Sequence, residues 1–455
     1  ANIVYTITPE LNTQNPAVLK ELTVNGISRE GFNPNRFTYI ANVTKTPSVN
    51  YTVDSGVTVN AMQTVKHWQA QVTSQGYTNT YEIWFYFPED KIPNEEFTEW
   101  SNCLTYTSAV KPTGWNTIAD ALGEHEGFGN FQPDGIVNKS GNDAVRLTTP
   151  YSTPGGGNIP GFITLGSVSG NWGVAGSSSF RILGGISFHN TPDQMSVKYY
   201  NKKVKNNSLI QYSLTGMNGV KTLEWKDSET RSNYKEAVYD LTEANYVAGD
   251  PSLLNITLCS FDGTYGTTNT ALNTLAEMYV DYIHFTYNSA LTSIKVNGNL
   301  ATKDGTHFTY TLEESDNTLL PSLEFIGEVD DQAQEIVWED EVINSLYAER
   351  TAMITNYAED GTSSAYTLTV KRPLESCNWL QDLQIDGKTI KGFNELTNTY
   401  EYHIPANCNH LPDIQPILSN HLQQLVLSYA DSTYSISIKP EKGQVRKYTI
   451  RIIKD

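Results

Sequence analysis

Short runs of alternating apolar and polar residues recur along the chain, and one arrangement of them occurs three times. Each copy begins with a run whose apolar residues share one face and which ends in an Asn-Gly or Asp-Gly pair. Alternation with a period of two indicates a half-buried strand, and these dipeptides favour a hairpin turn. The three runs are Leu19-x-x-Leu22-x-Val24-Asn25-Gly26, Leu291-x-x-Ile294-x-Val296-Asn297-Gly298 and Leu380-x-x-Leu383-x-Ile385-Asp386-Gly387.

Two more strands complete each copy, an aromatic strand and a closing strand that alternates in the same way. The first and third copies also share a Gly-Phe-Asn tripeptide after the turn, which the second copy lacks. A unit of several alternating strands is expected to fold as a small β-sandwich. The aromatic pairs are Phe37 with Tyr39, Phe308 with Tyr310, and Tyr400 with Tyr402; the closing strands begin at Tyr81, Tyr366 and Tyr448; the tripeptides begin at Gly31 and Gly392.

These three units resemble the cadherin-like and Ig-like β-sandwich modules of bacterial surface proteins. The resemblance covers residues 17–88, 289–372 and 377–455, and it implies spacers or scaffolding rather than catalysis. The sequence therefore predicts an all-β chain in which several Ig-like or cadherin-like β-sandwiches flank a galactose-binding-like jelly roll. The predicted domains are residues 1–96, 97–288, 289–372 and 373–455.

The segment 97–288 has a different texture, rich in Gly, Ser, Trp and Tyr, with short strands between glycine-rich turns. Many short strands of this kind suggest a jelly roll. The run from Met278 to Phe285 reads as a closing strand that carries one Asp among alternating apolar residues, a form familiar from galactose-binding-like jelly rolls.

With Phe97, Trp100, Pro112-x-Gly114-Trp115 and the end from Tyr279 to Tyr287, this segment resembles the carbohydrate metabolism domain family of bacterial surface lipoproteins. That family places a β-sandwich module before the jelly roll, and this chain has the same order. The resemblance implies glycan capture or processing. It supplies no catalytic residues to carry over.

The composition limits the kinds of molecule that the chain is expected to bind. The 455 residues carry a formal net charge of −19 at pH 7, which disfavours a large interface with nucleic acid or anionic lipid but is compatible with neutral glycans. The acidity is concentrated in 289–372, where a solvated acidic face is favoured over a calcium site because the regular Asp spacing of a calcium loop is missing. That segment includes Glu328, Asp330, Asp331, Glu335, Glu339, Asp340 and Glu341.

The chain has no apolar run long enough to span a bilayer, and it shows neither an initiator Met nor a signal peptide, so we expect its numbering to start inside a processed or truncated chain. The resemblance implies an extracytoplasmic location at the bacterial cell surface or anchored to the outer membrane, with a lipid anchor upstream. Buried free thiols are the expectation for the four cysteines, although two pairings stay open: Cys103 with Cys259, and Cys377 with Cys408.

A glycan site needs aromatic rings for the apolar faces of sugars and amide or carboxylate groups for their hydroxyls. Trp115, Trp172, Trp225 and Tyr265 lie in or beside Gly-rich or polar stretches and are the candidate carbohydrate-binding residues, with Trp172 the first choice. For any one of these aromatics the competing interpretation is a place in the core.

The sequence evidence for catalytic or cation-binding residues in the central segment is weaker than that for carbohydrate binding. Hydrolysis of a glycosidic bond needs two carboxyl groups, and an acidic cluster surrounds His125, but we assign no catalytic residues. We expect Asp281 to play a structural role, either as the ligand of a cation such as calcium or bonded to nearby backbone. The central acids are Glu124, Glu126, Asp134, Glu224, Asp262 and Asp281.

The eight histidines lack zinc-site spacing, and no nucleophile elbow or phosphate loop is present. We therefore expect a surface protein that binds a polysaccharide through the central jelly roll, with no cofactor apart from the calcium alternative at Asp281. A glycoside hydrolase and an adhesin or stalk that contacts surface proteins are the alternatives.

Overall fold

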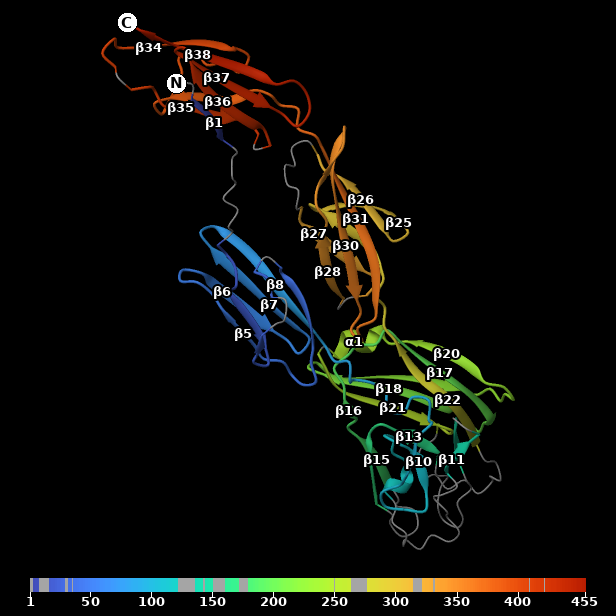
Figure 1. Ribbon diagram of the computed structural model, residues 1–455. Coiled ribbons are helices and arrows are strands. Elements are labelled where there is room, and N and C mark those ends of the chain that lie inside the picture. The colour runs from blue at the N-terminus through green and yellow to red at the C-terminus, as the bar shows by residue number, and fades with distance from the viewer. Residues whose placement is uncertain are drawn as a thin grey trace.

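The computed structural model shows an almost entirely β-stranded molecule (Figure 1). Its described part contains one α-helix, α1 (Thr242–Ala248), and one 3-10 helix, η1 (Ile118–Asp120). The predicted all-β, multi-sandwich fold is therefore confirmed. No helix within the described ranges has the length and hydropathy needed to cross a bilayer. The structure describes residues 3–7, 16–28, 32–34, 36–121, 136–141, 144–149, 160–171, 179–248, 250–262, 276–313, 321–329, 332–408, 410–420 and 422–455.

The first repeat module, residues 16–88, is a sandwich of two small sheets with strand orders β3-β2-β5 and β4-β8-β7-β6. Inward side chains such as Leu19, Leu22 and Tyr81 form its core. The pair β4–β8 is parallel, and the others are antiparallel. The strands are β2 (Glu21–Val24), β3 (Ile27–Ser28), β4 (Thr38–Asn42), β5 (Val49–Thr52), β6 (Thr58–Gln63), β7 (His67–Ser74) and β8 (Tyr77–Tyr86).

The second repeat module, residues 289–372, has the same plan, with β24-β23-β27 facing β25-β26-β31-β30-β28 and with β29 added on β30. Its parallel pair is β26–β31. The strands are β23 (Leu291–Val296), β24 (Asn299–Leu300), β25 (Thr302–Asp304), β26 (His307–Thr311), β27 (Leu323–Gly327), β28 (Ala333–Trp338), β29 (Val342–Ile343), β30 (Tyr347–Tyr357) and β31 (Ser363–Pro373).

The third repeat module, residues 377–455, packs β33-β32-β35 against β34-β38-β37-β36, again with one parallel pair, β34–β38. Strand β1 (Ile3–Ile7), from the other end of the chain, pairs antiparallel with the free edge of β36. Residues 3–7 therefore join the sheet of the third repeat module and not a sheet of the first. The remaining strands are β32 (Leu380–Ile385), β33 (Lys388–Thr389), β34 (Thr399–Ile404), β35 (Ile414–Leu418), β36 (Gln424–Ala430), β37 (Thr433–Lys439) and β38 (Arg446–Lys454).

One hydrogen bond is common to all three repeat modules. The backbone N–H of the first leucine of each run donates to the hydroxyl of a tyrosine within the closing strand, which ties the two sheets together. The bond joins Leu19 to Tyr81 at 3.2 Å, Leu291 to Tyr366 at 3.0 Å and Leu380 to Tyr448 at 3.2 Å. The turn residues Asn25, Asn297 and Asp386 all have positive φ, as a hairpin turn of this type requires.

The Gly-Phe-Asn tripeptide has a structural explanation. The Tyr39 hydroxyl donates to the Asn33 carbonyl at 2.8 Å, and the Tyr400 hydroxyl donates to the Asn394 carbonyl at the same distance. In the second repeat module the corresponding position is Phe308, which has no hydroxyl. The tripeptide is therefore absent where the tyrosine that bonds it is absent.

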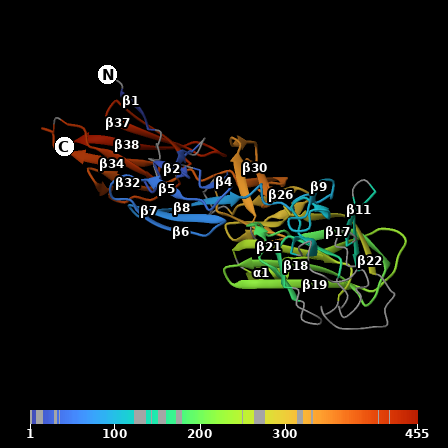
Figure 2. The same cartoon turned by 90° about the horizontal axis from the view of Figure 1, so that it is seen from below.

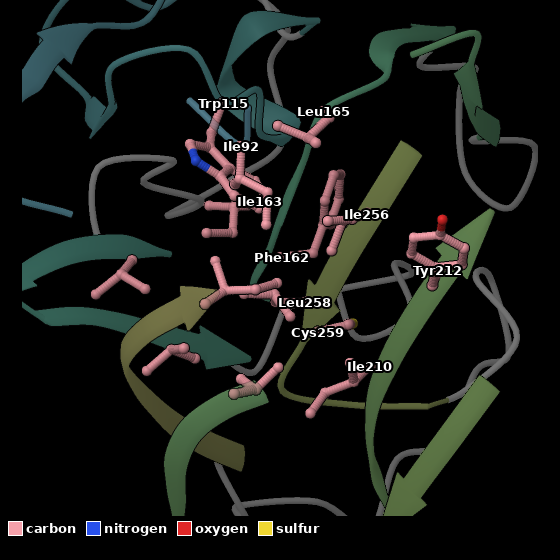
Figure 3. Packing of buried hydrophobic residues seen from close by; sticks show 14 of the residues in the cluster. Ile92, Trp115, Phe162, Ile163, Leu165, Ile210, Tyr212, Ile256, Leu258 and Cys259 are labelled. Atoms are coloured by element: carbon pink, nitrogen blue, oxygen red, sulfur yellow. The ribbon is translucent and has the colours of Figure 1, made fainter. Parts of the chain in front are cut away.

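The central domain is a sandwich of two five-stranded antiparallel sheets. One has the order β11-β12-β22-β17-β20; the other has β13-β21-β18-β19, with β16 on β21. Side chains from both sheets, such as Ile256 of β21 and Val280 of β22, form the core between them. Figure 3 shows part of this core, including Phe162, Ile210 and Ile256 of the second sheet. The strands are β11 (Val137–Ser140), β12 (Ala144–Thr149), β13 (Phe162–Thr164), β16 (Ile186–Ser187), β17 (Gln194–Lys203), β18 (Ser208–Gly216), β19 (Gly219–Asp227), β20 (Lys235–Asp240), β21 (Pro251–Cys259) and β22 (Ala276–Thr286).

Two small hairpins, β9 (Trp100–Asn102) with β10 (Val110–Pro112), and β14 (Ser167–Asn171) with β15 (Ser179–Leu183), flank this sandwich. The first and second repeat modules both sit against the central domain, and the third lies at the far end of the molecule (Figures 1 and 2). The first and second repeat modules also meet directly, where Arg36 forms an ion pair with Glu335 at 2.6 Å.

Candidate functional site

The predicted carbohydrate-binding aromatics do not form a site in the part of the chain that the structure describes. Trp115 is fully buried, and its indole N–H donates to the Pro93 carbonyl at 2.8 Å (Figure 3). Its ring faces are covered by the core, so Trp115 cannot stack on a sugar. Trp172 and Tyr265 lie outside the described residues.

Trp225 is half-buried on β19, where its ring stacks on Tyr239 of β20 at 4.3 Å between centroids. Since it also packs against the central core, one side of the indole is occupied by protein. Its place is at the edge where the two sheets of the central domain approach each other.

Asp281 forms an ion pair with Lys198, with 2.7 Å between the carboxylate and the ammonium. This bond raises the pKa of Lys198. A β-bulge creates the arrangement: Tyr199 pairs with Val280 and Lys198 with Tyr282, which leaves Asp281 as the extra residue of β22. Among the described residues no cluster of three metal-ligating side chains occurs, and the cation at Asp281 stays a prediction.

The other central acids are engaged or undescribed. Glu224 and Asp262 both pair with Lys226, at 3.9 and 2.8 Å, which places a cation between them. Glu124, Glu126 and Asp134 lie outside the described residues, as does His125. Each of the three predicted central acids that the structure describes is therefore paired with a lysine.

All four cysteines are free thiols. Cys103 and Cys259 are buried, and burial raises the pKa of each thiol to about 12. Both are therefore protonated and poorly nucleophilic at neutral pH.

A concave site lies elsewhere among the described residues, where the first repeat module, the central domain and the second repeat module meet. A cavity of about 610 Å³ opens there, and we call it the junction cavity. Sequence reasoning missed it because each of the three modules supplies only part of the wall, and the residues lie far apart in the chain. The lining residues that carry the argument are Lys66, His67, Trp84, Thr191, Asp193, Asn245, Asp250, Tyr287, Asn288, Glu328 and Glu359.

One wall of the junction cavity is aromatic. His67 at the start of β7 and Trp84 near the end of β8 are cross-strand partners, and their rings lie 4.4 Å apart at 34°. Trp84 is only partly buried and lines the cavity. Tyr287, which directly follows β22, also lines it. The wall thus offers the kind of ring surface that the sequence predicted in the central domain, but with the indole in the first repeat module.

A buried ion pair lies in the wall of the cavity. The Lys66 ammonium contacts the Glu359 carboxylate, and both residues are 7% exposed. Thr191 of the central domain completes the group: its hydroxyl accepts from Lys66 at 2.9 Å and donates to Glu359 at 2.7 Å. Because a buried charge without a partner is strongly destabilising, this group holds the three modules in one arrangement.

Polar groups surround the remaining space. Asp250 accepts from the Val65 backbone N–H at 3.3 Å, and Glu328 accepts from the Asn288 side-chain amide at 2.8 Å. A carboxylate has about four acceptor positions, so both groups can accept further bonds. The Asn245 amide donates to the Pro192 carbonyl at 2.8 Å, while its buried carbonyl oxygen has no partner among the described residues.

Burial raises the pKa of Tyr287 well above its ordinary value, and the nearby Glu359 carboxylate adds to the shift. The phenol is therefore neutral in any physiological range. The cavity combines an indole, a neutral phenol, carboxylates and an amide, a set that suits a ligand with both apolar faces and many hydroxyl groups.

No family model matches the chain, and no curated protein matches it. Among solved structures, the glycoside hydrolase domain of Endo-D from Streptococcus pneumoniae shows a similarity at 11% sequence identity with a TM-score of 0.18. The match covers 51% of this chain and 34% of that chain, so it spans about a third of the length of the structure it matches. A TM-score this low carries no argument about fold or activity. These comparisons therefore assign the chain to no family.

Proposed function

We propose that the protein binds carbohydrate and that the junction cavity holds a sugar residue. The observation that carries this proposal is the placement of the Trp84 indole and the Tyr287 phenol in one cavity with the polar groups of Asn245, Asp250 and Glu328. Sugar rings have apolar C–H faces that pack on aromatic rings, and hydroxyls that bond to carboxylates and amides.

The size of the cavity fits this ligand class. Small-molecule sites range over about 300–1,000 Å³, and the junction cavity, at about 610 Å³, lies inside that range. Carboxylates outnumber basic groups along its wall, which disfavours an anionic ligand. A neutral saccharide, whose hydroxyls donate to carboxylate oxygens, meets both conditions.

The repeat modules have a defined part in this proposal. The first contributes the indole, and the second contributes Glu328 and the acidic member of the buried ion pair. They are therefore components of the binding site as well as spacers. The bacterial cell surface is the location we propose, on the resemblance of the repeat modules and the central domain to parts of bacterial surface proteins.

The test is a glycan array followed by isothermal titration calorimetry with the intact chain. We expect binding to a neutral glycan, and we expect Trp84→Ala to weaken it about tenfold or more, since loss of a stacking ring removes about 1.4 kcal/mol. Glu328→Gln keeps an acceptor and tests the charge alone. Trp379→Ala, which alters a 40% exposed indole in the third repeat module, is the matched control.

Two results would overturn the proposal: an array on which the folded chain binds no neutral glycan, or a Trp84→Ala variant with unchanged affinity. Release of shortened products during the titration would assign hydrolysis rather than binding to the same cavity.

A further inference from the structure

A second aromatic surface lies on the central domain, on the outer face of the sheet β11-β12-β22-β17-β20. Alternation along β17 and β22 sends Tyr199 and Val280 into the core and places Tyr200 and Tyr279 on the opposite face. The extra residue at the bulge, Asp281, shifts the alternation of β22 by one position, so that Tyr282 also lies on this outer face. We call the surface of Tyr200, Tyr234, Tyr279 and Tyr282 the tyrosine face.

The four rings form a connected array. Tyr200 stacks on Tyr279 at 4.6 Å with an interplanar angle of 5°, and it meets Tyr234 edge-to-face at 4.8 Å. The Lys198 ammonium lies over both Tyr234 and Tyr282, at 5.7 and 5.4 Å from the ring centroids. These contacts hold the rings in fixed positions, so a ligand would meet a preorganised surface.

Tyr234 is the most accessible of the four tyrosines, at 37% exposed, whereas Tyr279 is 8% exposed. Burial, with the nearby Asp281 carboxylate, raises the pKa of Tyr234 to about 12. The phenol is therefore a neutral hydroxyl that can both donate and accept. Tyr234 offers a ring for stacking, and its neighbours offer ring edges and polar groups.

The charges on this face are balanced. Lys198 is paired with Asp281, and Arg146 is paired with the buried Glu277. A face with paired charges offers hydrogen-bond donors and acceptors without a net field. It therefore suits a neutral ligand better than a charged one.

The tyrosine face and the junction cavity lie on the same strands. β22 ends at Thr286, one residue before Tyr287, and β17 begins at Gln194, one residue after Asp193; Tyr287 and Asp193 both line the cavity. At about 3.4 Å per residue, the strand from Tyr279 to Thr286 spans about 24 Å. Tyr282, the member of the tyrosine face nearest to Tyr287 along the chain, lies five residues or about 17 Å from it, so a chain of several linked sugars is needed to reach from the cavity to the rings.

We infer that the tyrosine face is the extended section of the binding site and that the ligand is a neutral oligosaccharide or polysaccharide chain. One sugar residue occupies the junction cavity, and the residues linked to it lie along β17 and β22 against Tyr234 and Tyr282. This inference rests on the proposed function, and it deepens it from a sugar to a chain of sugars.

The test is calorimetry with neutral oligosaccharides of increasing length, from the single sugar to about six residues, prepared from glycans that the array identifies. For the intact chain we expect affinity to rise about tenfold or more with length. In the double variant Tyr234→Ala and Tyr282→Ala we expect that gain to disappear while binding of the single sugar is unchanged. Tyr77→Ala, which alters a 53% exposed tyrosine of the first repeat module, is the control.

The outcomes separate this inference from the proposed function. If affinity does not rise with length, or if the double variant keeps the full gain while Trp84→Ala abolishes binding, the junction cavity stands and the extended section is overturned. If the folded chain binds no sugar of any length, the proposed function itself fails.

Discussion

The Lys66 ammonium and the Glu359 carboxylate meet in a buried ion pair that joins the first repeat module to the second across 293 positions of sequence. Thr191 of the central domain bonds to both side chains. The junction cavity is thus built around a contact that none of the three modules could form alone. The relative placement of the three modules therefore determines the geometry of the proposed binding site.

We expect Lys66→Met to destabilise the module junction by about 3–5 kcal/mol, because it leaves the Glu359 carboxylate buried without its cation. Hydrogen exchange at the backbone amides of residues 189–191, 193 and 357–361 measures the effect locally. The double variant Lys66→Met with Glu359→Gln should recover much of the loss. Lys20→Met, which breaks an exposed pair with Asp54, is the control and should cost less than about 1 kcal/mol.

Equal exchange rates in Lys66→Met and the unaltered chain would show that the ion pair does not hold the modules together. The geometry of the cavity would then need another support.

We expect the hydroxyl of Tyr448 to contribute about 1–2 kcal/mol to the third repeat module. Tyr448→Phe removes the acceptor of the Leu380 N–H and leaves that buried donor unsatisfied. Urea unfolding of the third repeat module, followed by hydrogen exchange of β38, measures the loss. The same exchange measurement on β8 of the first repeat module should show no change, and a global effect on both modules would contradict the local role.

The sequence predicted the local strands and turns better than the contacts between distant segments. The alternating runs, the positive-φ turns at Asn25 and Asp386, and the shared tripeptide follow from residues close together in the chain, and these local patterns predicted the repeat modules. The pairing of β1 with β36 depends on segments more than 400 positions apart, and no local pattern indicates it.

The candidate site was harder to predict for the same reason. The sequence pointed to rings in glycine-rich stretches, but Trp115 lies in the core. Its burial is possible because its indole N–H donates to the Pro93 carbonyl. Two rings that line the cavity belong to ordinary strands of different modules: Trp84 lies near the end of β8, and Tyr287 directly follows β22. Their strand patterns look the same whether the ring faces solvent or another module.

We expect deletion of residues 1–7 to expose the edge of β36. Backbone amides of β36 that pair with β1 should exchange faster with solvent, and the shortened chain should self-associate more readily, because an unpaired strand edge is a template for another strand. Hydrogen exchange and analytical ultracentrifugation measure the two effects. Unchanged exchange at residues 425–429 would contradict the pairing.

The stability of the central domain should depend on acid through Asp227. Although burial opposes ionisation, hydrogen bonds from Arg231 and Lys235 hold the pKa of this carboxyl well below its ordinary value. A depressed pKa in the folded state adds stability that is present above the unfolded carboxyl pKa of about 3.9 and is lost as pH falls through the folded pKa.

Asp227→Asn should therefore be less stable than the unaltered chain at neutral pH, and the difference should shrink as pH falls below about 4. Thermal unfolding at a series of pH values measures it. A difference that stays constant across the series would show that Asp227 acts through packing and not through its charge.

The most direct test of carbohydrate binding at the junction is a crystal structure of the intact chain with a neutral oligosaccharide from the array. We expect one sugar ring against Trp84 with its hydroxyls bonded to Asn245, Asp250 or Glu328, and the linked sugar residues along β22. A sugar bound at another surface while the junction cavity holds only water would contradict it.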